Sequence, residues 1–404
     1  MQPLSRRTLL ARGLAGVSLA ASAPHFLGLT SRVFAADGPA PGARILVVLQ
    51  LSGGNDGLST VVPFADAAYH RARRTTGILE NEVLKLDKAV GLHPALASLR
   101  ALYEEGRFAI VQGVSYPNPN RSHFKSMDVW HAGDERGRSV PTGWLGRAVD
   151  ACCPTATQPE LVVNVGDTIP YALESDQHKP ISFDQPDSYR WTGNPQDAEK
   201  FQELNGQGCG EGEEISWLHR VAVSALSSSD KVVAAARAYR PKAEYPRGKL
   251  GDDLRGVASL IRAGLGTRIY YVSFGGFDTH NAQRNRHENL MRELNGALAA
   301  FYADLRAQGL SKEVVVLSFS EFGRRVGENA SAGTDHGVAG PMFLLGDGVK
   351  GGLYGKHPSL TDLDKGDLKM EVDFRSVYAS VLDDWMGMES RKVLGRSYPK
   401  LALL

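Results

Sequence analysis

The feature that most constrains the fold is a short run of apolar residues, Ile45–Leu51, that leads directly into a glycine-rich segment at residues 52–57. A run this short that is apolar on both faces indicates a strand in the middle of a sheet, with other layers covering both sides. Glycines immediately after it indicate a tight turn out of the sheet. We therefore expect a central strand whose carboxyl end opens into a loop.

Apolar runs of similar length recur along the chain, at residues 108–114, 161–165, 268–274, 314–320 and 342–345. Segments at residues 94–105 and 288–308 have leucines at helical spacing, and residues 373–385 are predicted to form a terminal helix. Strands that alternate with helices predict an α/β fold, here a three-layer α/β/α sandwich with a mostly parallel central sheet. Residues 175–212 are polar and aperiodic, and they are predicted to form a long insert or flexible cap outside that sheet.

The N-terminus has the three regions of an export signal. Arg6 and Arg7 precede an apolar run that is rich in Ala, Gly and Leu and contains no acid. Residues 33–36 then offer small side chains at the positions that a signal peptidase reads. We expect residues 1–35 to be a twin-arginine signal peptide that is cleaved after Ala35.

Two alternatives to a cleaved signal remain open. A retained membrane-spanning helix is disfavoured because Arg12 and His25 interrupt the apolar run, and a disordered terminus that merely contains two arginines does not account for the order of the three regions. With cleavage, the mature chain is one domain over residues 36–404, located in the periplasm or secreted, with the twin-arginine translocase as a partner and no stable membrane anchor. This route carries folded proteins, often with a cofactor or metal already inside.

The net charge and the cysteine content limit the kinds of partner and disulfide that the chain can have. Cleavage of the predicted signal peptide removes four arginines and no acidic residue, so the formal net charge changes from +1 for the whole chain to −3 for the mature chain. A nearly neutral chain lacks the excess of positive charge that is typical of proteins that bind nucleic acid. The three cysteines allow at most one expected bridge, from Cys152 or Cys153 to Cys209, because adjacent cysteines rarely bond to each other; the alternative is that all three are incidental.

Acids, histidines and a serine recur just after the predicted strands. They are Asp56 after the first run, Ser122 and His123 after the second, Asp278 and His280 after the fourth, Glu321 and Arg324 after the fifth, and Asp335 and His336 in a glycine-rich loop before the last. In an open α/β sheet, ligands bind outside the carboxyl ends of the strands, so these side chains are expected at one edge. Asp, Glu and His are ligands of divalent cations, and a serine at a helix N-terminus is well placed as a nucleophile because free backbone N–H groups there stabilise an anion.

Each of these residues also has a structural interpretation. Asp56 could shape a turn, Ser122 could be an N-cap, and Glu321 could pair with a nearby arginine. His280 and His336 could serve as hydrogen-bonding groups beside their neighbouring acids. The other histidines are expected at the surface or in packing, with His123 the first exception because it adjoins Ser122.

The same segments carry a family resemblance. The motifs are Leu51-Ser52-Gly53-Gly54-Asn55-Asp56-Gly57-Leu58, Tyr116-Pro117-Asn118-Pro119-Asn120-Arg121-Ser122-His123-Phe124, Phe277-Asp278-Thr279-His280, Ser320-Glu321-Phe322-Gly323-Arg324 and Gly333-Thr334-Asp335-His336-Gly337. In this order, they resemble DUF1501, an uncharacterised family of exported bacterial proteins that often bear twin-arginine signals. The resemblance covers nearly the whole mature chain.

That family is grouped with the alkaline phosphatase-like superfamily, which includes sulfatases and metal-dependent phosphoglycerate mutases. The resemblance implies a sandwich fold with two divalent ions, zinc, manganese, magnesium or calcium, around a nucleophile. It further implies a set of roles: Ser122 as nucleophile, Asp56 and Glu321 holding one ion together with Ser122, Asp278, His280 and His336 holding the other, and Arg324 neutralising the substrate anion.

The chain departs from the superfamily pattern at three places. Glu321-Phe322 stands where an Asp-His pair is usual, Asp278-Thr279-His280 is shorter than the usual Asp-x-x-x-His, and the sulfatase Cys-x-Pro-x-Arg signature is missing from the sequence. The leading interpretation is an exported metal-dependent hydrolase that acts on phosphate or sulfate esters. The alternative is a non-enzymatic exported binding or assembly protein on a degenerate form of the same fold.

Overall fold

The structure is a computed structural model of the chain. It describes residues 42–404 apart from positions 155, 157, 191–193, 195, 198–199, 202, 204–225 and 227. The predicted signal peptide and Cys209 therefore lie outside the described residues. Within the described part of the chain, no helix is both long enough and apolar enough to cross a membrane.

A nine-stranded sheet forms the middle of the molecule, with the strand order β11-β5-β10-β9-β1-β8-β6-β7 and β12 beside β5. The strands are β1 (Ile45–Leu51), β5 (Phe108–Ser115), β6 (Val162–Val165), β7 (Ile181–Phe183), β8 (Ile269–Phe274), β9 (Val314–Phe319), β10 (Gly340–Leu345), β11 (Gly352–Tyr354) and β12 (Val372–Asp373). All neighbours pair in parallel except β10, which is antiparallel to β5 and β9. The predicted α/β fold with a mostly parallel sheet is confirmed.

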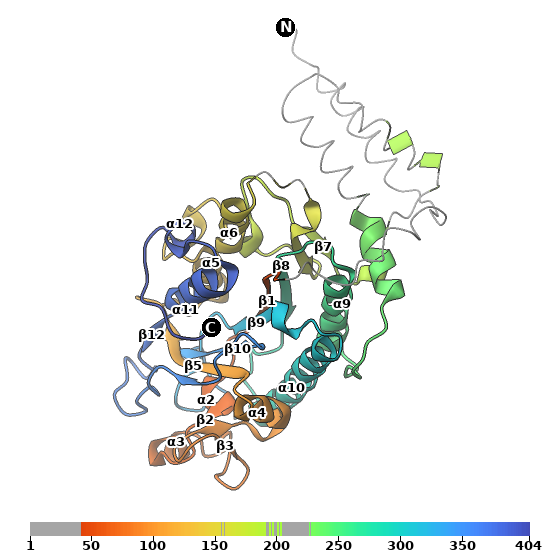
Figure 1. The fold of residues 1–404 in the computed structure, drawn as a ribbon. Coiled ribbons are helices and arrows are strands. Elements are labelled where there is room, and N and C mark those ends of the chain that lie inside the picture. The colour runs from red at the N-terminus through yellow and green to blue at the C-terminus, as the bar shows by residue number, and fades with distance from the viewer. Residues whose placement is uncertain are drawn as a thin grey trace.

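Helices cover both faces of this sheet, as Figure 1 shows. One layer holds α4 (Ala97–Glu104), α9 (Lys249–Ala263) and α10 (Gln283–Ala307), and the other holds α5 (His123–Ala132), α6 (Trp144–Cys152), α11 (Phe374–Ser380) and α12 (Ser390–Leu394). Alternate residues of β1 face the two layers: Val47 and Leu49 pack in the core with α10, while Leu46 and Val48 pack in the core with α5. Because β1 is apolar on both faces, it can only be stable between two such layers.

Smaller elements complete the described chain. A second sheet of β2 (Val61–Val62), β4 (Gly91–Leu92) and β3 (Leu84–Lys85) lies near α2 (Gly57–Thr60) and α3 (Ala67–Ala72). A 3₁₀ turn, Pro94–Leu96, precedes α4, and a π-helical turn, Val381–Met386, follows α11. The predicted helices at residues 94–105, 288–308 and 373–385 therefore exist, although α10 begins five residues earlier than its leucine pattern indicated.

Two expectations are corrected by the structure. The polar segment at residues 175–212 does contribute to the sheet, since β7 pairs in parallel with β6; three residues are too few to display a strand period. Cys152 forms a disulfide with its neighbour Cys153, instead of a bridge from one of them to Cys209.

Candidate metal centre

The loops that carry the expected site residues meet at one edge of the sheet. β1, β5, β8 and β9 run in the same direction, so the segments that follow them leave the sheet together. The loop before β10 joins them because β10 runs the opposite way. Gly53 has a φ of 120°, and a Cβ there would lie 2.5 Å from the backbone nitrogen of Asp278. Only glycine allows the loops after β1 and β8 to approach this closely.

Three imidazoles surround the carboxylate of Asp278. The Nε2 atoms of His280 and His336 lie 3.0 Å and 3.1 Å from Asp278 Oδ1, and the Nε2 of His123 lies 3.6 Å from Asp278 Oδ2. The Nε2 atoms of His280 and His336 are 2.9 Å apart. We call these four side chains, which come from three different loops, the histidine–aspartate cluster.

The outer nitrogen of each ring is held by an oxygen. His123 Nδ1 lies 2.7 Å from Glu321 Oε1, His280 Nδ1 lies 3.2 Å from Asp335 Oδ1, and His336 Nδ1 lies 2.8 Å from the backbone carbonyl of Arg121. A carbonyl or carboxylate oxygen can only accept a hydrogen bond, so each Nδ1 is the protonated nitrogen. Each neutral ring therefore presents the lone pair of Nε2 to the centre of the cluster.

This arrangement is unfavourable for the protein alone and favourable around a cation. Unprotonated Nε2 atoms of His280 and His336 face each other and the carboxylate of Asp278 at about 3 Å, which brings like partial charges together. Ligand atoms around a tetrahedral zinc ion are about 3.3 Å apart, given metal–ligand distances of about 2.0–2.1 Å. Tethering of the outer imidazole nitrogen to an oxygen is also the usual support of a metal-bound histidine. His123, Asp278 and His336 each offer a ligand atom within 4.8 Å of the other two, and His280 Nε2 lies beside His336 and Asp278, so the donor set fits a divalent cation.

Buried Arg324 supports the carboxylate of the cluster. Its Nη2 donates to Asp278 Oδ1 at 2.6 Å and to the backbone carbonyls of Gly53 and Phe277, while Nε and Nη1 donate to the carbonyls of Gly54 and Thr334. Partial burial alone would raise the pKa of Asp278, but the hydrogen bond and positive charge of Arg324, with smaller effects of His336 and His280, lower it to about 2. Asp278 is therefore ionised, and about half of its side chain remains exposed, at 48%.

The pKa shifts of the histidines differ with their surroundings. The hydrogen bond to Glu321 raises the pKa of His123, since it stabilises the imidazolium form. Burial lowers the pKa of His336, which favours the neutral ring that can act as a ligand.

Ser122 directly precedes the cluster residue His123 in the chain. It is exposed, it occupies the N-cap position of α5 immediately before His123, and its hydroxyl does not cap the helix. Its backbone N–H instead donates to the side chain of Asn120 at 2.8 Å. The sequence predicted that Ser122 could be both the N-cap residue of a helix and a nucleophile. In the structure it occupies the N-cap position, but its hydroxyl makes no hydrogen bond to the helix N-terminus.

Asp56 is not part of the cluster. Its side chain is fully buried and forms a two-point ion pair with Arg73, at 2.5 Å and 3.1 Å. Ser59 and Gln283 also donate to Asp56 Oδ2, and Leu58 N donates to Oδ1. Burial opposes ionisation, but the charge of Arg73 and these hydrogen bonds hold the pKa of Asp56 well below its usual range. Both oxygens are occupied, so the structure assigns Asp56 the turn-shaping role and corrects its placement at a metal.

Two further expected roles change. Glu321 is buried and accepts from His123 Nδ1 and from Gly53 N, so it orients a cluster histidine and does not face the centre itself. Arg324 is also buried, and each of its side-chain nitrogens donates to Asp278 or to a backbone carbonyl, so in this structure it positions the carboxylate of the cluster.

The residue that the sequence interpretation had left out of the metal site is His123. The available signal was its position next to Ser122 at the end of a strand. The supporting roles of Asp335 and of the Arg121 carbonyl could not be read from residue spacing, because they depend on how the loops before α5 and β10 pack together.

The fold and the cluster define an α/β protein with a candidate metal centre at the carboxyl edge of its sheet. Residues 109–396 match the family described as protein of unknown function, DUF1501, and the chain belongs to that family. A search among curated proteins finds no match.

Solved structures show a remote similarity. They include the C-terminal periplasmic domain of EcEptC from Escherichia coli in complex with Zn, at 10% identity over 75% of this chain and 73% of that chain with a TM-score of 0.36. They also include the phosphonate monoester hydrolase SpPMH from Silicibacter pomeroyi, at 10% identity over 89% and 78% with a TM-score of 0.37. A third is a protein in the alkaline phosphatase superfamily from Vibrio parahaemolyticus, at 8% identity over 96% and 78% with a TM-score of 0.37. At such values, the chemistry of the site rests on its own side chains.

Proposed function

We propose that this protein is an exported metal-dependent hydrolase of phosphate or sulfate esters. The ion would be held by Nε2 of His123, His280 and His336 and by the carboxylate of Asp278. The observation that carries this proposal is the inward direction of three Nε2 lone pairs, each fixed by an oxygen at the opposite ring nitrogen. Zinc is the ion that best suits three imidazoles and one carboxylate.

Ser122 is the proposed nucleophile. It is exposed and directly precedes His123, a residue of the cluster, with consecutive Cα atoms about 3.8 Å apart. A divalent ion at the cluster would supply positive charge that favours the alkoxide form of a nearby hydroxyl and polarises the oxygens of a phosphoryl or sulfuryl group. The protein's own contribution is to orient the imidazoles through Glu321 and Asp335 and to keep Asp278 ionised through Arg324.

The test measures metal content and turnover on the same preparations. The purified protein is expected to contain about one zinc per chain and to hydrolyse 4-nitrophenyl phosphate or 4-nitrophenyl sulfate. Ser122→Ala should abolish turnover with zinc retained, His336→Ala should lose both, and Ser188→Ala, at another exposed serine, should change neither. Protein without bound metal, or turnover that ignores Ser122→Ala, would contradict the proposal.

A second candidate is a metal-binding protein without hydrolytic activity. It is favoured by the engagement of Asp56 with Arg73 and of Glu321 with His123, because neither acid is then free to hold a second ion beside Ser122. Stoichiometric zinc with no turnover of any ester in a broad panel is the result that would select it.

We also propose export by the twin-arginine translocase, on the strength of Arg6 and Arg7 and the cleavage site at Ala35. Replacing both arginines with lysine should leave the full-length precursor in the cytoplasm. Unchanged processing of that variant would contradict this route.

A further inference from the structure

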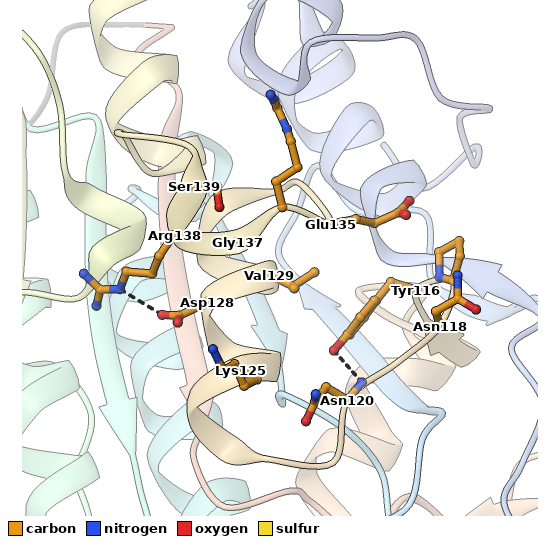
Figure 2. Close-up of a pocket in the computed structure, with 12 residues that line it drawn as sticks. Tyr116, Asn118, Asn120, Lys125, Asp128, Val129, Glu135, Gly137, Arg138 and Ser139 are labelled. Atoms are coloured by element: carbon orange, nitrogen blue, oxygen red, sulfur yellow. Dashed lines mark hydrogen bonds and ion pairs between the residues drawn. The ribbon is translucent and has the colours of Figure 1, made fainter.

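A cavity of about 490 Å³ adjoins the segment that carries Ser122. It lies between the loop after β5, the outer face of α5 and the 3₁₀ turn Gly137–Ser139, as Figure 2 shows. Its lining is polar: Tyr116, Asn118, Asn120 and Ser139 supply hydroxyl and amide groups, and Lys125, Asp128, Glu135, Arg136 and Arg138 supply charges.

The cavity is close to the proposed nucleophile. Asn120 lines it and is two residues before Ser122, and two residues of extended chain span at most about 7 Å. Lys125 lines it from the first turn of α5, three residues after Ser122. The side chain of Asn120 also accepts the N–H of Ser122 at 2.8 Å. A substrate whose ester group is at Ser122 can therefore extend into this cavity.

The charges that line the cavity are compensated with one exception. Asp128 pairs with Arg138 at 2.9 Å and Arg136 pairs with Asp134 at 2.8 Å. Glu135 pairs with Arg375, which lies outside the lining, at 2.8 Å. Among the described residues, no acidic side chain lies within ion-pair distance of exposed Lys125. The cavity therefore has one ammonium group available to a ligand.

The side chains of the two lining asparagines also have groups available to a ligand. The side chain of Asn118 is exposed, on a backbone with φ of 52° that asparagine tolerates better than most residues. Asn120 uses its side-chain oxygen for Ser122 N, which leaves its amide nitrogen directed elsewhere. Amide side chains both donate and accept, so they are suited to hydroxyl groups, which do the same. An ammonium group is suited to a charge-assisted hydrogen bond with an anion.

We propose that this cavity binds the leaving-group portion of the substrate, and that this portion is a polyhydroxylated group with an anionic substituent of its own. Lys125 pairs with the anionic substituent, and Asn118 and Asn120 bond to hydroxyl groups. The assignment rests on the proposed hydrolase function, since it is Ser122 and the neighbouring cluster that place the ester group. It deepens that function by naming the substrate class as esters of anionic sugars or sugar-like polyols.

The test uses calorimetric titration of the zinc-loaded protein over residues 36–404, carrying Ser122→Ala so that the esters are not hydrolysed, with three probes: inorganic phosphate, glucose 1-phosphate and glucose 1,6-bisphosphate. We expect the bisphosphate to bind about 10-fold more tightly than glucose 1-phosphate, through one charge-assisted contact, and glucose 1-phosphate to bind more tightly than phosphate. Lys125→Gln should remove the advantage of the bisphosphate and keep that of glucose 1-phosphate. Asn118→Gly, which suits the positive φ, should reduce the advantage of glucose 1-phosphate over phosphate.

Controls separate this proposal from the hydrolase proposal. Lys88→Gln, at an exposed lysine between β3 and β4, should leave all three affinities unchanged, and each variant should bind zinc as the wild type does. Equal affinities for the three probes, or a preference that survives Lys125→Gln, would overturn the cavity assignment while bound zinc and turnover remain. Lack of bound zinc would instead count against the hydrolase, and the same titrations of the metal-free protein would then decide whether Lys125 selects the second phosphate.

Discussion

Two acids that follow glycine-rich strand ends have opposite surroundings in this molecule. Asp56, after β1, is fully buried and saturated by Arg73, Ser59, Gln283 and a backbone N–H. Asp278, after β8, is half exposed, receives one guanidinium donor and otherwise faces imidazole nitrogens. The position of an acid after a strand therefore does not decide its role. The donors that reach it from other loops do.

The largest expected effect concerns the stability of the Asp56–Arg73 pair. Arg73→Met leaves the buried carboxylate of Asp56 without its counter-ion and should lower the free energy of unfolding by about 3–5 kcal/mol. The measurement is urea denaturation of the metal-free protein. Arg107→Met, which breaks a more exposed pair with Asp347, is the matched control and should cost less than about 1 kcal/mol.

The same variant also tests the separation of the two sites. The folded fraction of Arg73→Met should still bind zinc, because Arg73 does not contact the histidine–aspartate cluster. A variant of normal stability, or one that folds but has lost zinc, would break the distinction between a structural acid and a ligand acid.

A smaller effect is expected from the residues that orient the imidazoles. Glu321→Gln weakens the hydrogen bond that fixes His123, and loss of such a support usually lowers metal affinity by about 10–100-fold. Competition titration with a chelating dye would measure it. Glu82→Gln, at an acid that pairs with Arg284 away from the cluster, should leave zinc affinity unchanged, and an equal loss in both variants would show that the Glu321 contact has no specific role.

The smallest predicted effect is a pH dependence of the free energy of unfolding that arises from two buried histidines, His93 and His287. Burial lowers the pKa of His93 to about 3 and that of His287 to about 4, so both are neutral in the folded protein. Because the unfolded chain binds these protons more readily, the stabilisation is complete above the unfolded pKa of about 6.5 and is lost as pH falls towards 4. Each histidine contributes a slope of at most about 1.4 kcal/mol per pH unit in that window.

The check is the free energy of unfolding of the metal-free protein between pH 7 and pH 5. His287→Gln should show a shallower slope than the wild type, whatever its absolute stability. A slope that is the same in both proteins would show that His287 is not held neutral by its surroundings.

Much of the fold could be predicted from the sequence because β1 and its neighbours are apolar on both faces, a pattern that requires two covering layers. Asp278 and His280 were predicted at this edge because they follow a strand of the sheet, and His336 because its glycine-rich loop precedes the last predicted strand. What could not be predicted was pairing between distant loops. Arg73 reaches Asp56 from α3, and no residue spacing connects the two.

Contacts between segments that are distant in sequence also explain why the roles predicted for other residues were wrong. Glu321 follows a strand like a ligand does, but Gly53 N and His123 Nδ1 turn it into a support. Strand β7 is only three residues long, Ile181–Phe183, so its apolar pattern is too short to read. His123 had the right position, but only the packing of α5 against the loops after β8 and β9 brings its ring to Asp278.

The central claim is that three imidazoles and one carboxylate share a single ion. The most direct test is anomalous diffraction at the zinc edge from crystals of the zinc-loaded protein. The account predicts one strong peak within about 2.0–2.2 Å of Nε2 of His123, His280 and His336 and of an Asp278 oxygen. A map without a peak there, or with the ion held by Asp56 instead, would contradict it.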